Sequence, residues 1–313
     1  MKADFRKTRF KDIRRSDMTD GAQETVGFIG LGVMGEAMCR NLVTKSFKKI
    51  LAFDLNADPL ARIKEDGAHI AISAAELGET SDVIITCLPG GAEVRDLVLG
   101  KDKLLGHLDE GKILIDMSTS EPSVMREIGA EAAMRGVDFA DAPIARTRQA
   151  AIDGTLAIMV GAEKNLFERI EPILKTMGSE IVHCGGIGAG QVVKIMNNMV
   201  LFQTVQALAE ALSIAERSGV DGKLLLETLS KGSADSFALH NHGMKSLLPD
   251  HYPEKAFSVT YAMKDLSYAL SMAEDVGVNA SGAASVKRNF VQAIQAGDGD
   301  RYFPAIRRSL AKP

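Results

Sequence analysis

Short apolar runs with little charge alternate with longer amphipathic stretches between Val26 and about Gly186. Apolar runs of about four to eight residues are typical of strands that are buried on both faces. Stretches with apolar residues at a spacing of about three to four positions are typical of helices that cover such strands. The alternation predicts an α/β fold built on a doubly wound parallel sheet, with strands within residues 26–29, 49–54, 82–89 and 112–116.

The pattern changes after Gly190, where strand signals become few and apolar residues recur at helical spacing. Residues 191–217 predict one long helix, which is rich in Ala, Met, Val and Leu around its circumference and must be buried on several sides. We expect this helix to join the sheet domain to an all-helical domain and to contribute to a subunit interface. The predicted organisation is an N-terminal extension (1–24), a Rossmann domain (25–187) and a helical substrate and oligomerisation domain (188–313).

The composition is that of an ordinary globular chain, with 313 residues, 46% hydrophobic and 25% charged, and a formal net charge of -4. This length allows two domains with separate cores. A slightly acidic chain without a basic, aromatic-interleaved stretch is not expected to bind nucleic acid, and no apolar segment reaches the roughly 18 residues of a membrane span. Cys39, Cys87 and Cys184 are odd in number and widely spaced, which favours buried free thiols in a reducing compartment, the cytoplasm.

Residues 1–24 are rich in Lys and Arg and show no core pattern. A secretory signal contains an apolar core, which this stretch lacks. A transit peptide is poor in acidic residues, whereas this stretch contains Asp4, Asp12 and Asp17. We interpret it as a flexible extension.

A glycine-rich segment follows the first predicted strand and precedes a helix. Such glycines allow a tight turn that brings backbone N–H groups and the positive end of the helix against a pyrophosphate. Asp54 lies at the end of the second predicted strand, where a carboxylate can accept both ribose hydroxyls and would repel a 2′-phosphate. The segment therefore predicts a nicotinamide-dinucleotide site that favours NAD over NADP, formed by Gly30, Leu31, Gly32, Val33, Met34, Gly35 and Asp54.

Two further strands end in residues that suit a ligand site. Leu88 and Pro89 are expected to flank the cofactor, and Ser118 and Thr119 are expected to donate hydrogen bonds to cofactor or substrate, since open α/β sheets bind ligands at the carboxyl ends of their strands. The alternative is that residues 118–120 form a plain helix N-cap before Glu121-Pro122.

Candidate chemistry lies at the start of the long helix. Lys194 and Asn198 are four residues apart and share one helix face, with Asn197 beside them. Hydride transfer from an alcohol requires a second group that moves the hydroxyl proton, and a desolvated lysine can do this. We therefore expect Lys194 and Asn198 to be catalytic, with Asn198 holding Lys194 or the substrate oxygen in line. The alternative is that Lys194 extends from a helix end to solvent.

These motifs together resemble the β-hydroxyacid dehydrogenases, which include 3-hydroxyisobutyrate dehydrogenase and tartronate semialdehyde reductase. The resemblance covers about Val26 to Leu310 and implies NAD as cofactor, a small anionic substrate, an interdomain cleft, and a homodimer or homotetramer. It implies that Lys194 is the catalytic lysine, that Asn198 binds substrate, and that Lys264 reaches the cofactor; Lys264-Asp265 alone is typical of a solvated charge pair. The motifs are Gly27–Gly35, Asp116–Thr119, Asp141–Pro143, Asp153–Leu156, Gly190–Asn198 and Lys264–Leu266.

One departure concerns the substrate anion. After Asp141-Ala142-Pro143-Ile144 the commonest members carry Ser-Gly-Gly, whereas this chain carries Ala145-Arg146-Thr147-Arg148. A guanidinium suits a carboxylate, sulfonate or phosphate. The Arg-Thr pair resembles the branch that contains sulfolactaldehyde reductase, which implies that Arg146 and Thr147 clamp a sulfonate, with Asn197 and Asn198 near the hydroxyls. The alternative is that Arg146 pairs with a nearby acid.

Other functions remain open. An oxidative decarboxylase resembling 6-phosphogluconate dehydrogenase also uses a lysine but needs a larger basic cluster, and a non-catalytic dinucleotide sensor needs only the cofactor site. A metal site is not expected, because His183 and Cys184 lack suitably spaced partners. His240 and His242 lie in a polar, turn-like stretch and are interpreted as surface histidines.

Overall fold

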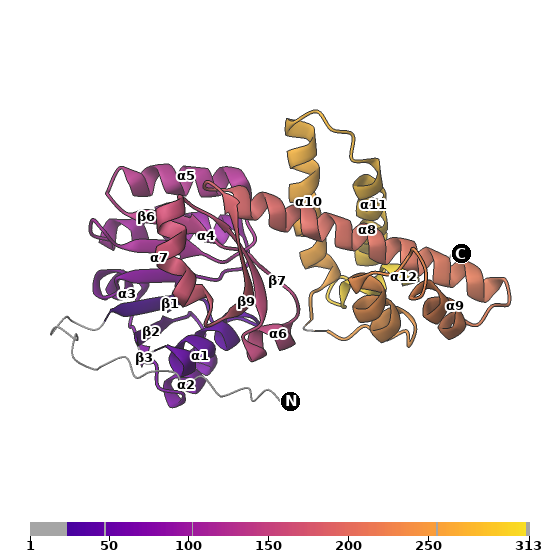
Figure 1. The fold of residues 1–313 in the computed structure, drawn as a ribbon, viewed down its shortest axis with the longest axis horizontal. Coiled ribbons are helices and arrows are strands. Elements are labelled where there is room, and N and C mark those ends of the chain that lie inside the picture. The colour runs from indigo at the N-terminus through magenta and orange to yellow at the C-terminus, as the bar shows by residue number, and fades with distance from the viewer. Residues whose placement is uncertain (1–23, 47, 102, 255, 311–313) are drawn as a thin grey trace, which may run out of the picture.

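A computed structural model describes residues 24–46, 48–101, 103–254 and 256–310. One long helix runs from a sheet with flanking helices into a smaller helical bundle (Figure 1). The predicted extension over residues 1–24 lies almost entirely outside the described residues.

The sheet confirms the predicted doubly wound architecture. Its strand order is β3-β2-β1-β4-β5-β6-β8-β7, with β9 paired to β8, and the pairings among β1 to β6 are parallel. The chain reverses direction at the edge, where β6 and β7 pair with β8 in antiparallel fashion. The strands are β1 (Thr25–Ile29), β2 (Lys49–Phe53), β3 (His69–Ile70), β4 (Val83–Thr86), β5 (Ile113–Asp116), β6 (Asp138–Asp141), β7 (Ile144–Ala145), β8 (Leu156–Gly161) and β9 (Gly178–Gly185).

The central strands β1, β4 and β5 are buried on both faces, and their successive side chains enter different cores because strand residues alternate in direction. Phe28 belongs to one apolar cluster and Ile29 to the other. The first cluster includes α1 (Gly35–Lys45), α2 (Ala57–Glu65), α6 (Arg148–Asp153) and α7 (Lys164–Leu174). The second includes α3 (Ala74–Thr80), α4 (Gly91–Leu99), the 3-10 helix η1 (Leu104–His107) and α5 (Pro122–Ala133).

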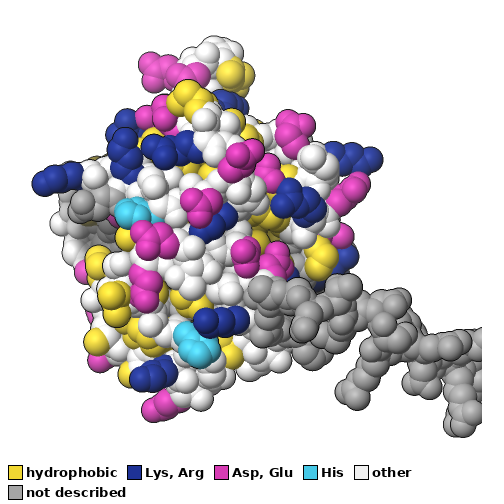
Figure 2. Space-filling model, turned by 90° about the vertical axis from the view of Figure 1, so that its left-hand side faces the viewer, with side chains coloured by type: hydrophobic (Ala, Val, Ile, Leu, Met, Phe, Trp, Pro, Cys, Tyr) yellow, Lys and Arg dark blue, Asp and Glu magenta, His cyan; other side chains and the backbone are white. Residues whose placement is uncertain are grey.

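The outer surface of the sheet domain carries charges of both signs. In the view of Figure 2, Lys and Arg side chains are interspersed with Asp and Glu. Surface ion pairs such as Arg95–Glu127 (2.7 Å) and Arg169–Asp138 (2.6 Å) link neighbouring elements of this domain.

The long predicted helix is α8 (Ala189–Arg217), which begins against the sheet and continues as the centre of the helical bundle (Figure 1). Phe202, Leu208 and Leu212 are buried in the bundle core. None of the described helices, including α8, is long and apolar enough to cross a membrane. The bundle comprises α9 (Gly222–Leu229), η2 (Leu239–Leu247), α10 (Val259–Asp275), α11 (Ser281–Gln295), η3 (Phe303–Ala305) and α12 (Ile306–Ser309).

The interpretation of His242 as a surface residue is wrong. The stretch that carries it is not a turn but the π-helix η2, in which the His242 side chain is 5% exposed. Its Nδ1 lies 2.7 Å from the hydroxyl of Tyr302, and burial lowers the pKa of the imidazole to about 4. His242 is therefore a neutral core residue, which a polar sequence neighbourhood did not reveal.

The start of α8 is fastened to the sheet by Asp141, the last residue of β6. Its buried carboxylate accepts hydrogen bonds from the backbone N–H groups of Gly188 (2.5 Å) and Gln191 (2.9 Å). N–H groups at the start of a helix have no acceptor within the helix, so Asp141 of β6 acts as a cap for α8. Gly190 makes this approach possible, because a Cβ there would overlap the carbonyl oxygen of Met159 and crowd Asp141.

Replacing Asp141 with Ala should lower the free energy of unfolding by about 2 kcal/mol, because two buried N–H groups lose their acceptor. Chemical denaturation followed by circular dichroism measures this loss. Asp138→Ala is the matched control, since Asp138 lies on the same strand and forms only an exposed ion pair with Arg169, worth about 1 kcal/mol or less. Equal losses in both variants would contradict the capping role.

Candidate active site

The glycine loop between β1 and α1 has the shape of a dinucleotide cradle. Gly30 has φ +97, and a Cβ there would overlap the carbonyl oxygen of Cys87. A Cβ at Gly35 would overlap the carbonyl oxygen of Gly30. A Cβ at Gly32, in contrast, would have no protein atom within 4 Å, so packing does not require glycine there. An open position at the start of a helix fits the close approach of a pyrophosphate.

Asp54 lies beside this loop at the end of β2. Its Oδ2 accepts a hydrogen bond from the Leu31 N–H (2.6 Å), and its Oδ1 accepts one from the Asn56 N–H (2.7 Å). The carboxylate is thereby held next to the loop, where it suits the ribose hydroxyls of NAD and repels a 2′-phosphate.

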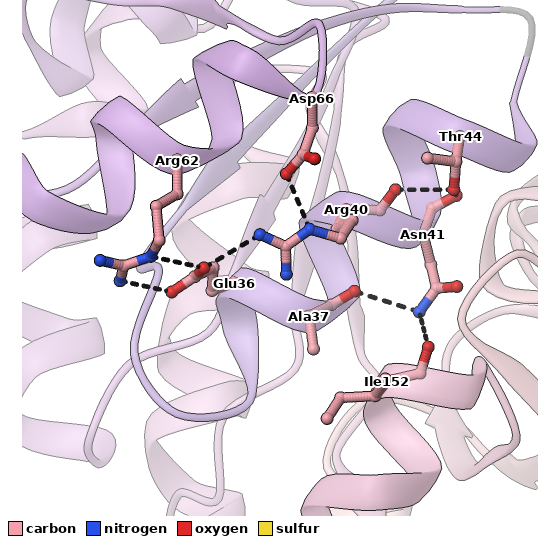
Figure 3. Close-up of polar contacts among 8 residues, drawn as sticks. All are labelled: Glu36, Ala37, Arg40, Asn41, Thr44, Arg62, Asp66 and Ile152. Carbon is pink, nitrogen blue, oxygen red and sulfur yellow. Dashed lines mark hydrogen bonds and ion pairs between the residues drawn. The ribbon is translucent and has the colours of Figure 1, made fainter.

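The arginines nearby are already engaged by acids. Arg62 forms two hydrogen bonds with Glu36 (2.9 and 2.7 Å), and Arg40 lies between Glu36 and Asp66 (Figure 3). The Arg62 guanidinium is the main cause that holds the pKa of Glu36 below its ordinary value. This network joins α1 to α2, and its charges are matched within the protein rather than directed at a phosphate.

The carboxyl ends of β4 and β5 are joined by the Ser118 hydroxyl. This hydroxyl donates to Asp116 Oδ1 (2.6 Å) and accepts from the Leu88 N–H (2.9 Å). Thr86 Oγ1 donates to the same carboxylate (2.8 Å). Asp116 is fully buried, which raises the pKa of its carboxyl despite these hydrogen bonds. Ser118 thus positions the Leu88-Pro89 segment, and its contact with substrate stays a prediction.

The alternative that residues 118–120 cap α5 is wrong, because the N-cap is Glu121 and no side chain caps this helix. The polar residues of this loop instead bond to α8. Gln191 Nε2 donates to the carbonyl of Ser118 (2.8 Å), and its Oε1 accepts from the Ser120 N–H (3.0 Å). Gln191 is completely buried. Its sequence pattern did not single it out, although a residue three positions before Lys194 lies on the same helix face.

Lys194 lies one turn into α8 and is 9% exposed, so the alternative in which it extends to solvent is wrong. Its Nζ donates to Asn198 Oδ1 (3.1 Å), and Asn197 Nδ2 donates to the same oxygen (3.1 Å). Burial lowers the pKa of Lys194 to about 8, and the charge of Lys264 acts in the same direction while that of Asp265 opposes it. A lysine with this pKa can both donate and accept a proton near neutral pH.

Asn198 is held in turn by Asp265 of α10. Asn198 Nδ2 donates to Asp265 Oδ2 (2.7 Å), which orients the amide so that its oxygen faces Lys194. Asp265 is 2% exposed and pairs with Lys264 (3.0 Å between Nζ and Oδ1). Asp265 therefore links α10 to α8 from a buried position. The interpretation of Lys264-Asp265 as a solvated charge pair is wrong.

Lys264 and Tyr261 of α10 join the helical domain to the two strand-end loops. Lys264 Nζ donates to the carbonyl of Thr119 (3.1 Å) and lies about 5 Å from the ring centres of Tyr261 (5.0 Å) and Tyr268 (4.9 Å). Tyr261 donates its hydroxyl hydrogen to the carbonyl of Pro89 (2.6 Å). Lys264 thus contacts Thr119, and Tyr261 contacts Pro89; the binding of cofactor by these residues stays a prediction. Neither tyrosine was singled out in the sequence.

Arg146 and Thr147 lie between β7 and α6. Arg146 has φ +87, a conformation that favours glycine, and its guanidinium donates to Ser179 Oγ (3.0 Å) and to the carbonyl of Thr155. Glu180 lies 4.0 Å away, so an acid is near, as the alternative expects. Thr147 Oγ1 accepts from the Ala150 N–H (3.4 Å) and caps α6. The clamp role of both residues stays a prediction.

Two family models together cover nearly the whole described chain. Residues 25–186 match the NAD-binding domain of 6-phosphogluconate dehydrogenase. Residues 188–310 match the NAD-binding domain of NADP-dependent 3-hydroxyisobutyrate dehydrogenase.

Individual relatives agree with these models. A probable mitochondrial 3-hydroxyisobutyrate dehydrogenase of Dictyostelium discoideum is 32% identical over 97% of this chain and 95% of its own. A 2-(hydroxymethyl)glutarate dehydrogenase of Eubacterium barkeri is 34% identical over 81% of this chain and 83% of its own. A solved 3-hydroxyisobutyrate dehydrogenase of Mycobacterium tuberculosis, with L-serine, has a TM-score of 0.84 at 30% identity, covering 93% of this chain and 100% of that one. The chain therefore belongs to the 3-hydroxyisobutyrate dehydrogenase-like family of β-hydroxyacid dehydrogenases and is an NAD(P)-dependent oxidoreductase that acts on CH–OH groups.

Proposed function

We propose that this enzyme transfers a hydride between NAD and the carbinol carbon of a short β-hydroxy acid, forming or consuming the semialdehyde, with Lys194 as general acid and base. The observation that carries this proposal is the buried Lys194 Nζ, hydrogen-bonded to Asn198 and with its pKa lowered to about 8. The names of the relatives, which are dehydrogenases of hydroxy acids, support this substrate class.

The direction of proton transfer depends on the protonation state of Lys194. NAD, when bound, accepts or supplies the hydride. In oxidation the neutral amine takes the hydroxyl proton, and in reduction the ammonium returns a proton to the developing alkoxide. Asn198 holds Nζ in place, and Asp265 holds Asn198, so the proton-transfer group needs little reorganisation during the reaction. Asn197 and Asn198 supply amide donors for the substrate hydroxyls.

Within this class we propose an anion clamp formed by Arg146 and Thr147, and a sulfonated three-carbon aldehyde, sulfolactaldehyde, as a second candidate substrate. The feature that favours the sulfonate is the Arg-Thr pair in place of Gly-Gly. The Arg146 side chain is 38% exposed, so it can turn from Ser179 towards a bound anion. Its planar donors match a sulfonate as well as a carboxylate.

The functional oligomer we propose is a homodimer or homotetramer that uses α8. Val193, Val200 and Ile214 are separated by multiples of seven residues, lie along one stripe of this helix and are 41%, 58% and 66% exposed. Multi-angle light scattering should give at least twice the monomer mass of 33.5 kDa. Val200→Glu should reduce that mass, whereas a monomeric wild type would contradict the proposal.

The pH dependence of turnover should follow the Lys194 amine. Its pKa of about 8 lies below the ordinary lysine value, because burial disfavours the ammonium. The kcat/KM for oxidation should therefore rise with pH and level off above about 8, whereas the kcat/KM for reduction should fall above about 8. Initial rates followed by NADH absorbance between pH 6 and 10 measure both. A profile that is flat in both directions would contradict the role of Lys194.

Lys194→Ala separates an enzyme from a dinucleotide sensor. The variant should lose about 10²- to 10⁴-fold in kcat, because the proton-transfer group is removed, while the Kd for NADH stays within a few-fold. Lys175→Ala is the control, since that lysine is exposed and pairs only with Glu171. Unchanged turnover in Lys194→Ala would exclude general acid-base catalysis by Lys194. Turnover of 6-phosphogluconate with release of carbon dioxide would favour the decarboxylase instead.

The substrate anion can be tested with sulfolactaldehyde, tartronate semialdehyde, methylmalonate semialdehyde and succinate semialdehyde. Arg146→Gly removes the guanidinium and suits the local φ of +87. If Arg146 clamps a sulfonate, the KM for sulfolactaldehyde should rise about 10- to 100-fold, as expected for the loss of a charged hydrogen bond. Arg169→Gly, an exposed arginine paired with Asp138, is the control. Preference of the wild type for a carboxylate would overturn the sulfonate assignment and leave the family and Lys194 intact.

A further inference from the structure

Asn41 is a buried polar residue in the middle of α1, and nothing in the chemistry above uses it. It is 5% exposed and lies two turns after the glycine loop that begins this helix. Asparagine is a poor residue for a helix interior because its side chain competes for backbone hydrogen bonds. A buried asparagine in this position therefore needs a partner outside its own helix.

That partner is the last turn of α6. Asn41 Nδ2 donates to the carbonyl of Ala151 (2.7 Å) and lies 3.3 Å from that of Ile152, besides the carbonyl of Ala37 in its own helix (3.1 Å). Figure 3 shows the Asn41 amide between α1 and the segment that carries Ile152. The last carbonyls of a helix have no partner within it, so Asn41 provides a donor that water would otherwise supply.

Lys45, one turn further along α1, contacts the same end of α6. Its Nζ lies 3.3 Å from the carbonyl of Asp153. Gly154 ends α6 with φ +69, and a Cβ there would overlap Lys45 Nζ and lie 3.0 Å from Asn41 Oδ1. Side chains of α1 therefore pack closely around the corner where α6 ends.

The two helices that meet here begin at different parts of the active site. The chain enters α1 from the glycine loop that suits the pyrophosphate of NAD. It enters α6 from Arg146 and its N-cap Thr147, the segment assigned above to the substrate anion. A six-residue helix is short, so fixing its last turn also fixes the residues that precede its first turn.

We propose that Asn41 is a positioning residue for substrate specificity: by tying α6 to the dinucleotide helix, it sets the place of the 146–147 segment relative to bound NAD. This inference rests on the proposed function, since it takes Arg146 and Thr147 as the anion site. The Asn41 amide bonds to carbonyls of α1 and α6, so its role in this proposal is to position other residues. Its loss moves the anchor of the substrate anion, while the glycine loop, Asp54 and Lys194 keep their own hydrogen bonds.

The experiment compares two aldehydes that differ in the anion. Tartronate semialdehyde carries a carboxylate where glyceraldehyde carries a neutral CH₂OH group. In Asn41→Ala, the kcat/KM for tartronate semialdehyde should fall about tenfold, whereas that for glyceraldehyde and the Kd for NADH should stay within about twofold. Thr44→Ala is the matched control, because Thr44 is exposed on the same helix and its hydroxyl bonds only to carbonyls of α1. A general loss of stability would reduce both aldehyde activities together and leave their ratio unchanged.

A binding measurement provides a readout without turnover. Titration of glycerate, which carries the same carboxylate, into the enzyme with NADH should show an affinity about tenfold weaker in Asn41→Ala than in the wild type. If Asn41→Ala does not fold, Lys45→Ala decides, because Lys45 is exposed and contacts the same corner; a two- to threefold loss of the aldehyde ratio is then expected.

The wild type separates the two possible failures. A wild-type enzyme with no preference for tartronate semialdehyde over glyceraldehyde would overturn the anion site of the proposed function and this inference with it. A wild-type preference that persists unchanged in folded Asn41→Ala, or in Lys45→Ala when that variant decides, would overturn only the inference.

Discussion

The attachment of α8 to the carboxyl ends of β5 and β6 is the constraint on which the rest of the site depends. Asp141 accepts the first free N–H groups of the helix, and Gln191 bonds to the backbone on both sides of Thr119. Both side chains are buried, so water does not compete for these hydrogen bonds. Lys194 follows Gln191 by one turn, so this attachment fixes the position of Lys194 relative to the cofactor loop.

A buried lysine is costly unless its surroundings compensate for lost hydration. Here the compensation comes from a second helix: Asp265 of α10 holds Asn198, and Asn198 accepts from Lys194. The positive charge of Lys264 opposes this compensation, because it lowers the pKa of Lys194 further. The balance of burial, one carboxylate and one neighbouring ammonium gives a pKa of about 8, which suits proton transfer in either direction. Neither α8 nor α10 alone contains this balance.

Arg146 adopts a backbone conformation that favours glycine. A non-glycine residue at φ +87 costs about 1–3 kcal/mol, and the hydrogen bonds of its guanidinium with Thr155 and Ser179 offset part of that cost. The segment is further held by Thr147 at the start of α6 and by Asn41 at its end. Several contacts therefore hold this turn in place. They allow arginine at position 146, although the conformation favours glycine.

The sequence by itself determined the sheet, the long helix, the glycine loop and the partnership of Lys194 with Asn198. These features depend on local spacing: strand and helix periods, glycines at a turn, and residues four apart on one helix face. The roles of Asp141, Gln191, Asp265 and Asn41 were decided only by the tertiary structure, because each bonds to a segment at least 47 residues away. The same reason explains His242, whose burial depends on Tyr302 and not on its polar neighbours. Hydrogen bonds between distant segments have no periodic signature, so the sequence indicated which groups could react and the fold decided what holds them.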